Sequence, residues 1–435
     1  MQRSPALPRP FRIGMLRIAP AAAACLALFS GAALAQSAGE AELARRLDQL
    51  AAELAAVKAQ LSQLQQQRSA APPAAVPAIA APAAPSEPAT VITGYGEINY
   101  NRPTRATDKT QADVRRFVLG YQHRFDAKTK LVTELEVEHA VTSASDPGEV
   151  AIEQAYIEHQ FSPAWAVRAG VFLMPVGLLN ENHEPNAFYG VERNFVETAI
   201  IPTTWREGGL QLVGSFDNGL TLQTGISTSF DMTKWDATSS AGVDSPLGAV
   251  HQEMALAKAR DLAWFGALNW RGVPGLQLGG SLFAGNATHG RSGFARSRVT
   301  LWDAHARWAP GRWDLAALYA RGGISNSAAL NLPLVGNATL IPQAFDGWYA
   351  QAAYKLWTQQ DYALSPFVRV EQFNTARRYA DLGPGLTPAA LPTEQVLTLG
   401  ASFQLTPGVV VKADLQRFRE NRDNNRVNLG LGFSF

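Results

Sequence analysis

The chain has 435 residues, of which 46% are apolar, and it carries 38 Lys and Arg against 37 Asp and Glu. This charge balance gives no indication of nucleic-acid binding, and the apolar fraction excludes a chain that is disordered throughout. The 36 glycines, 10 tryptophans and 20 phenylalanines suit an all-β protein.

An export signal is predicted over residues 1–35. Four arginines at positions 3, 9, 12 and 17 precede an apolar run, 21–35, that ends in Ala-Leu-Ala. This is the layout of a secretory signal peptide, and Met15 is an alternative start that keeps the same layout. An uncleaved membrane anchor is less favoured because the apolar run is short for a span. Lipid attachment through Cys25 is a weaker alternative, because little apolar sequence precedes this cysteine.

The chain that remains from Gln36 lacks cysteine and therefore cannot form a disulfide. Loss of the four leader arginines leaves 34 Lys and Arg against 37 Asp and Glu, a net charge of −3. After cleavage we expect no segment with the roughly 20 continuous apolar residues of a membrane helix. A membrane location for the mature chain would therefore require strands.

A coiled coil is predicted over 36–68, followed by an Ala/Pro-rich linker over 69–90. Leucine or valine recurs at gaps of four and three for three heptads, at Leu43, Leu47, Leu50, Leu54, Val57, Leu61 and Leu64. This spacing predicts self-association, although a single helix packed on its own barrel is an alternative. The six prolines of the linker indicate a semi-extended spacer without a core.

The remaining segment, 91–435, divides into sixteen short segments with a period of two. The predicted strands are 91–100, 113–125, 130–140, 151–161, 164–174, 207–216, 220–230, 261–271, 276–284, 298–308, 313–323, 347–357, 364–374, 394–405, 409–420 and 426–435. Their connections alternate between tight turns, such as Asp217-Asn218-Gly219, and long polar loops. An even number of strands with this sorting of loops predicts an antiparallel transmembrane β-barrel.

The two faces of the predicted strands agree with a barrel. Glu134, Glu136 and Glu138 share one face of a strand whose other face carries Leu135 and Val137. Because unpaired carboxylates are costly to bury, we expect this face to be wet, either in a barrel lumen or on the solvent side of a soluble sheet. The loop pattern favours the lumen, with interfacial aromatic side chains near strand ends at Trp264, Trp270, Trp308, Trp313, Trp348 and Trp357.

Alternation assigns equal numbers of basic and acidic side chains to the lumen. The basic ones are Arg116, Arg124, Arg168, Arg271, Arg307, Lys355, Arg369 and Lys412, and the acidic ones are Glu97, Glu134, Glu136, Glu138, Glu158, Asp303, Glu371 and Asp414. Phosphate recognition requires several convergent Arg or Lys donors, so this balance argues against a phosphate trap.

The mature chain resembles the phosphate-selective porin O/P family of the Gram-negative outer membrane. The segments that carry the resemblance are GEVAIEQAYIEHQFSPAWAVRAGVFLMPVGLLNENHEP, residues 148–185, and NFVETAIIPTTWREGG, residues 194–209. The resemblance implies a trimer of sixteen-stranded barrels embedded in outer-membrane lipid. It also implies recognition of the last strand, through Phe433 and Phe435, by the barrel assembly machinery.

The resemblance further implies that the third long loop, between Pro175 and Arg206, folds inward and narrows the channel. The candidate constriction residues are Asn182, His183, Glu184, Glu192, Arg193, Glu197, Arg206 and Glu207. Because this loop is acidic, we expect a diffusion pore for ions and small polar solutes with weak selectivity, leaning toward cations if at all. An anion-selective or phosphate-selective porin is the alternative.

Other classes of function are less favoured. Asp303 and His305 lie in phase but point to no serine, His183 and Glu184 lack further ligands at metal spacing, and carboxylates two residues apart cannot flank a substrate. We therefore expect no catalytic site, no metal and no cofactor. A protein that tethers the outer membrane to a periplasmic partner through its N-terminal helix, and a soluble exported β-protein, remain alternatives.

Overall fold

The computed structural model describes residues 45–46, 49–50, 52–60, 89–143 and 145–435. The predicted signal peptide and almost all of the predicted linker lie outside these residues. The described residues between 45 and 60 are helical, with Leu50, Leu54 and Val57 exposed. The coiled coil remains a prediction. Among the described residues, no helix has the length and apolar character needed to cross a membrane.

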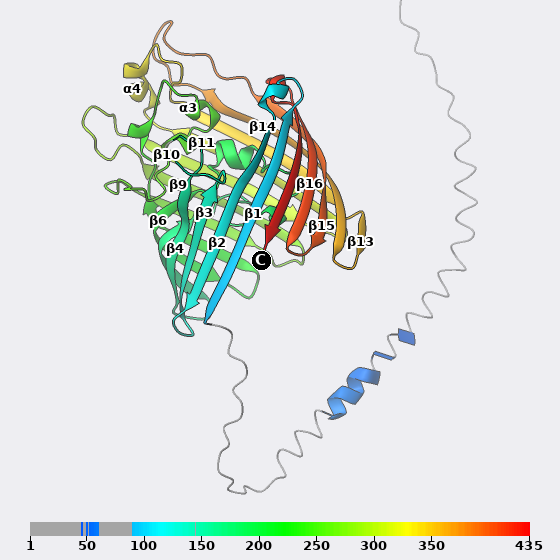
Figure 1. Ribbon diagram of the computed structural model, residues 1–435. Helices are drawn as coiled ribbons and strands as arrows, with labels where there is room; N and C mark the ends of the chain where they lie inside the picture. The colour runs from blue at the N-terminus through cyan, green and yellow to red at the C-terminus, as the bar shows by residue number, and fades with distance from the viewer. Residues whose placement is uncertain (1–44, 47–48, 51, 61–88, 144) are drawn as a thin grey trace, which may run out of the picture. The chain divides into compact units, whose positions relative to one another are not determined.

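Residues 90–434 form one closed antiparallel sheet (Figure 1). Neighbouring strands in the chain pair with each other, except that β12 pairs with β14, and the last strand pairs with the first. The strands are β1 (Thr90–Pro103), β2 (Gln111–Arg124), β3 (Thr129–Glu138), β4 (Val150–Gln160), β5 (Trp165–Leu173), β6 (Arg206–Ser215), β7 (Leu220–Thr228), β8 (Leu262–Trp270), β9 (Leu276–Asn286), β10 (Arg298–Trp308), β11 (Trp313–Ile324), β12 (Ala344–Tyr354), β13 (Trp357–Gln359), β14 (Tyr362–Arg378), β15 (Glu394–Thr406), β16 (Val409–Phe418) and β17 (Arg426–Ser434).

The predicted count of sixteen barrel strands is confirmed. The short β13 does not add a strand to the barrel, because β12 and β13 pair with different parts of the same strand, β14. At the closure, the Gly94 N–H donates to the Phe435 carbonyl and the Phe435 N–H donates to the Gly94 carbonyl, at 3.0 and 2.9 Å. A closed barrel leaves no free strand edge, which is the condition for a sheet to lie in lipid.

The connections are sorted by length between the two ends of the barrel. One end carries tight turns, at 125–128, 161–164, 216–219, 271–275, 309–312, 360–361 and 407–408. The other end carries the longer loops, at 104–110, 139–149, 174–205, 229–261, 287–297, 325–343, 379–393 and 419–425. These loops contain short helical turns, η1 (Thr107–Lys109), η2 (Pro185–Ala187), η3 (Val196–Ile200), η4 (Met232–Lys234), α3 (Ala241–Asp244), η5 (Gly248–Val250), α4 (Ser327–Asn331), η6 (Leu332–Leu334) and η7 (Arg422–Asn424). The long-loop end is the end expected to face the cell exterior.

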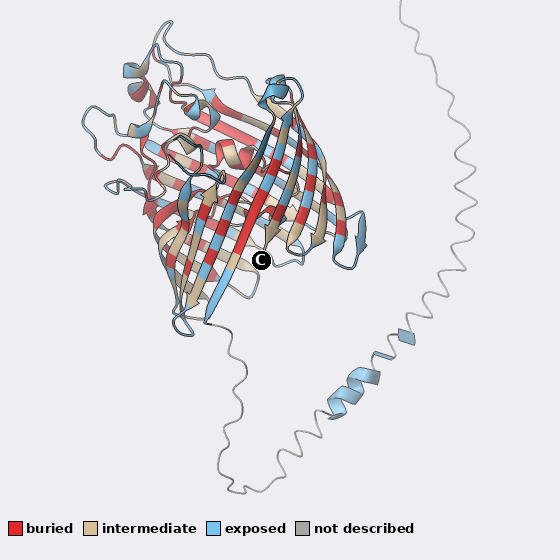
Figure 2. Ribbon diagram, viewed as in Figure 1, coloured by how far each residue is buried: buried red, intermediate tan, exposed pale blue. Residues whose placement is uncertain are grey.

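Burial alternates along the strands, as Figure 2 shows. In β2, Phe117 and Leu119 are each 42% exposed, whereas Arg116 and Val118 beside them are buried. The predicted aromatic positions Trp264, Trp308, Trp313, Trp348 and Trp357 are also exposed. The exposed apolar side chains belong to the outer face, which would contact lipid, and the buried side chains point inward.

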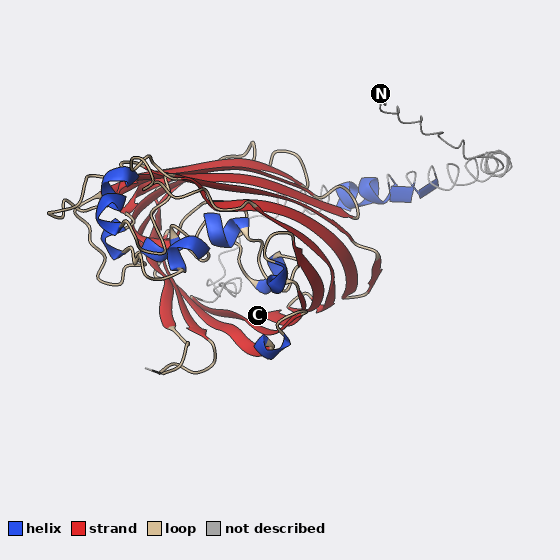
Figure 3. Ribbon diagram, turned by 90° about the horizontal axis from the view of Figure 1, so that it is seen from above, coloured by secondary structure: helices blue, strands red, loops and turns tan. Residues whose placement is uncertain are grey.

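The barrel interior is filled in part by loops that fold into it, and Figure 3 shows helical turns within the ring of strands. The largest buried apolar cluster joins the inner wall to these loops. Trp205 stacks on Phe230 with ring centroids 5.0 Å apart and meets Phe283 of β9 edge-on at 4.9 Å. The loop 229–261 therefore folds onto the loop 174–205, a contact that the sequence did not predict.

Candidate functional site: the infolded loop and the barrel wall

The loop 174–205, called the infolded loop from here on, leaves β5 and returns to β6 at one place on the wall. Its ends are joined by a hydrogen bond from the Met174 N–H to the Trp205 carbonyl, at 2.9 Å. Six predicted constriction residues lie in it, namely Asn182, His183, Glu184, Glu192, Arg193 and Glu197. The other two, Arg206 and Glu207, do not, because they pair with Leu173 and Phe172 in the β5–β6 ladder.

Three wall carboxylates hold the backbone of the infolded loop. Asp303 on β10 accepts the Gly177 N–H at 3.1 Å. Asp414 on β16 accepts the Val191 N–H at 2.7 Å, and Glu371 on β14 accepts the Phe195 N–H at 2.6 Å. Hydrogen bonds to a charged acceptor are stronger than neutral ones, so these contacts fix the loop on strands far apart around the barrel.

Other wall residues bind the loop through its carbonyls and side chains. Lys412 on β16 donates to the Gly190 carbonyl at 3.0 Å and lies 3.6 Å from the centre of the Phe188 ring. Tyr349 on β12 donates to Glu197 at 3.0 Å. Several residues predicted to line an open pore therefore serve here as attachment points for the loop.

Two of the glutamates of β3, Glu136 and Glu138, are paired with an arginine, and Glu136 is also buried. Arg116 on β2 reaches Glu136 and Glu138 of β3 at 2.9 and 3.3 Å, and Glu97 of β1 at 3.3 Å. Glu136 is only 4% exposed. The expectation of a wet face was therefore wrong for this carboxylate, because a guanidinium on the adjacent strand replaces the water that would otherwise solvate it.

Three other predicted lumen arginines also bind carboxylates. Arg168 lies 2.7 Å from Glu158, and Arg307 lies 2.6 Å from Asp314. Arg369, which is 2% exposed, lies 2.6 Å from Glu371. These guanidinium groups already have counter-charges, which limits the net field that each can present to a passing ion.

Cavities lie on both sides of the infolded loop. The larger, of about 840 Å³, is at the long-loop end and is lined by both acidic and basic side chains, including Glu97, Asp113, Glu192, Arg115, Arg116, Arg193 and Arg426. The smaller, of about 160 Å³, reaches the turn at Pro407 and is lined by Phe188, Tyr189, Arg307 and Lys355 among others. Residues of the infolded loop line both cavities. This is the arrangement expected if the loop narrows the channel between two wider spaces.

Glu153 lies in the wall beside the loop and was not among the residues predicted from the sequence. Strand alternation would have placed Glu153 on the lipid face, opposite to Glu158. A bulge in β4 changes this, because Glu134 pairs with Gln154 and Leu135 pairs with Ile152, which leaves Glu153 as the extra residue. Its side chain is fully buried and accepts a hydrogen bond from the Tyr95 hydroxyl at 3.0 Å.

Acidification is expected to loosen the second inward loop, 229–261. Burial, and then the charges of Arg206 and Lys234, lower the pKa of His251 to about 4. Since the unfolded value is about 6.5, folding favours neutral His251, and this contribution to stability is present above pH 6.5 and is lost as the pH falls toward 4. Limited proteolysis of the loop should therefore be faster at pH 4.5 than at pH 7.5.

The same measurement on two variants separates His251 from general acid effects. His251→Gln should reduce the pH dependence of cleavage within 229–261, whereas His139→Gln, in another long loop, should leave it unchanged. Equal cleavage rates at both pH values in the unaltered protein would contradict this role.

A closed barrel of this size, with an apolar outer face and a loop held across its interior, defines the class of protein as a porin. A porin is an outer-membrane channel through which small solutes diffuse passively. Residues 93–241 match the family of phosphate-selective porin O and P, which is the family that the sequence resembles.

One relative and two solved structures are similar to this chain. An uncharacterized protein of Aquifex aeolicus (strain VF5) is 28% identical over 357 residues, which cover 79% of each chain. The fold is similar to OmpF of Salmonella typhi, solved in complex with daunomycin, with a TM-score of 0.56 and 12% identity over 80% of this chain and 97% of the other. It is also similar to the outer membrane channel DcaP of Acinetobacter baumannii, with a TM-score of 0.50 and 13% identity over 80% and 97%. At these identities the two structures show the fold alone.

Proposed function

We propose that this porin is a weakly selective, water-filled channel for ions and small polar solutes. The observation that carries the proposal is the pairing of four inward-facing arginines, since Arg116, Arg168, Arg307 and Arg369 each contact a carboxylate. A phosphate site needs several donors that are free to converge on one anion. Paired groups of both signs instead create a transverse field that favours polar solutes without strong charge discrimination.

The infolded loop presents less negative charge to the lumen than its number of glutamates suggests. Glu197 is 4% exposed and accepts the Leu178 and Leu179 N–H groups at 2.6 and 2.7 Å. Burial raises the pKa of Glu197 and also that of Glu181, which accepts a hydrogen bond from Gln223. We therefore expect a cation preference that is small.

A preference for anions is the second candidate, and one observation favours it. Arg115, Arg193 and Arg426 line the larger cavity together, and Arg193 donates to Thr203 and Thr204 rather than to a carboxylate. The family description also names phosphate. Against this candidate, Glu97, Asp113 and Glu192 line the same cavity.

The proposal places the barrel in the outer membrane, with the tight turns and any N-terminal coiled coil on the periplasmic side. A trimer is proposed from the family resemblance and the heptad pattern. Recognition of Phe433 and Phe435 by the barrel assembly machinery is proposed from the resemblance of the alternating last strand, with its terminal phenylalanine, to the signal of outer-membrane barrels. The fold and family indicate a channel rather than an enzyme.

Swelling of liposomes tests the diffusion function directly. Vesicles that contain the refolded barrel should swell in isotonic neutral sugars, at rates that fall steeply as the sugar becomes larger. Vesicles prepared with heat-denatured protein serve as the control. A chain without residues 36–87 should give the same rates, whereas a failure of the smallest sugars to enter would contradict the proposal and favour a tether.

A further inference from the structure

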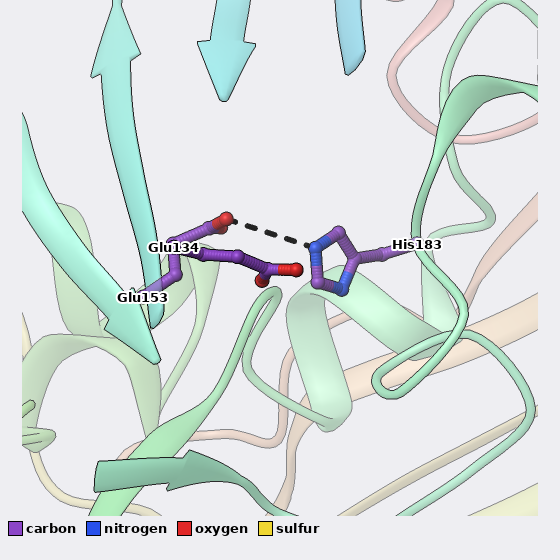
Figure 4. Close-up of side chains that lie close together, drawn as sticks. All are labelled: Glu134, Glu153 and His183. Atoms are coloured by element: carbon purple, nitrogen blue, oxygen red, sulfur yellow. Dashed lines mark ion pairs between the residues drawn. The ribbon is translucent and has the colours of Figure 1, made fainter. Parts of the chain in front are cut away.

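A histidine and two glutamates meet where the infolded loop touches the wall, as Figure 4 shows. Glu134 belongs to β3, Glu153 to the bulge of β4, and His183 to the loop. One side-chain ligand atom from each lies within 4.8 Å of the other two. The His183 Nε2 lies 3.8 Å from the Glu153 Oε2.

Two buried atoms in this cluster lack a hydrogen-bond partner. They are the Nε2 of His183, which is 3% exposed, and the Oε1 of Glu153, which is completely buried. Buried polar atoms are nearly always satisfied, because leaving one without a partner costs free energy. Two such atoms at one contact between loop and wall point to a ligand that binds both residues.

The surrounding hydrogen bonds orient all three side chains toward a common point. The Nδ1 of His183 lies 2.9 Å from the Asn180 carbonyl, which can only accept, so the Nδ1 carries a hydrogen. In a neutral ring the Nε2 then presents its lone pair, as it does in histidines that bind metals. The Tyr95 hydroxyl donates to Glu153 at 3.0 Å, and Gln154 donates to Glu134 at 2.6 Å.

The local charge favours a cation at this point. The three ion pairs of Arg116 are with Glu97, Glu136 and Glu138, none of which is in the cluster. The guanidinium of Arg193 donates to Thr203, Thr204 and the His183 carbonyl. Both arginines lie near enough to act electrostatically on Glu153, but their hydrogen bonds and ion pairs are with groups other than its carboxylate. The carboxylates of Glu134 and Glu153 therefore contribute negative charge beside the imidazole and remain available to a cation.

We propose that Glu134, Glu153 and His183 form a binding site for a divalent transition-metal ion that joins the infolded loop to the barrel wall. One imidazole and two carboxylates suit Zn²⁺ and leave a further coordination position for water. With metal–ligand bonds of about 2.1 Å, tetrahedral ligand atoms lie roughly 3.4 Å apart, so the cluster needs to contract only slightly on binding. The proposal differs from the expectation of no metal, which relied on ligand spacing along the sequence, because the three ligands come from separate segments.

Zinc binding to the refolded full-length mature protein tests this proposal. The protein is freed of metal with a chelator, and Zn²⁺ is titrated by calorimetry while bound zinc is measured by elemental analysis after gel filtration. We expect about one zinc per chain, with affinity at least tenfold weaker in both His183→Ala and Glu153→Gln. The test needs no channel activity, so its failure is distinguishable from failure of the proposed transport function.

His305→Gln is the matched control, because both ring nitrogens of this inward histidine already have partners. They lie 2.6 Å from Asp303 and 2.9 Å from Asn269. This variant should bind zinc as the unaltered protein does. If His183→Ala does not fold, Glu134→Gln replaces it, and the same tenfold loss is expected. Absence of zinc binding in the unaltered protein, or equal binding in the cluster variants, would overturn the proposal.

Discussion

Replacement of Arg116 by methionine should lower the free energy of unfolding of the barrel by about 3–5 kcal/mol, the range for removal of one partner from a buried ion pair. The side chain of Arg116 is 4% exposed and contacts three glutamates. Methionine fills a similar volume but leaves Glu97, Glu136 and Glu138 without their counter-charge. Guanidinium-induced unfolding of the barrel in lipid vesicles measures the change.

Two further variants serve as controls for the change in unfolding free energy of Arg116→Met. Arg116→Lys retains the charge but cannot reach three carboxylates with a rigid fork of donors, so we expect an intermediate loss. Arg422→Met, at an exposed position in η7, should change the free energy by no more than about 0.5 kcal/mol. A loss of under about 1 kcal/mol for Arg116→Met would show that water, rather than Arg116, solvates these glutamates.

Replacement of residues 178–202 by a short Gly-Ser linker should raise the single-channel conductance roughly twofold or more, because the narrowest part of a pore dominates its resistance. The replacement is sterically simple, since Met174 and Trp205 already lie side by side. The wall carboxylates that bind the loop would then face water in the lumen. Planar-bilayer recordings at fixed salt concentration measure the conductance.

The control for the loop replacement is a change of similar kind at an exposed site. Replacement of 383–390, in the loop after β14, should leave the conductance unchanged. If the shortened barrel does not fold, Asp414→Ala removes one of the three loop attachments, and increased current noise is expected in its place. Unchanged conductance and noise in all of these variants would contradict a constriction by the infolded loop.

The barrel itself could be predicted from the sequence because lipid imposes a simple rule on every strand. Outward positions must be apolar over the membrane, so alternation alone separated Trp302 and Trp308 from Asp303 and His305. The sorting of tight turns and long loops between the two ends of the barrel followed from chain connectivity, and the structure has this sorting. Strand boundaries shifted by a few residues where strands extend beyond the membrane, as in β1 and β14.

The details of the site could not be predicted because they depend on contacts between distant segments. Alternation misplaces Glu153, since a bulge inserts one residue and turns its side chain inward. Glu136 was expected to be solvated by water, but it is paired with Arg116 instead. This pairing follows from the strand register that sets Arg116 opposite Glu138 on the neighbouring strand, and the sequence did not reveal that register. The attachment of Val191 to Asp414 joins residues more than 200 positions apart, and no local pattern encodes such a contact.

Zero-current potential across a planar bilayer is the most direct test of weak selectivity through paired charges. Single channels of the refolded mature chain would be recorded under a potassium chloride gradient, and phosphate would then be added at increasing concentration. The account predicts a potential close to zero, at most slightly cation-selective, and no block by phosphate. A strongly anion-selective potential with block at low phosphate would contradict it, and would mean that Arg115, Arg193 and Arg426 govern permeation.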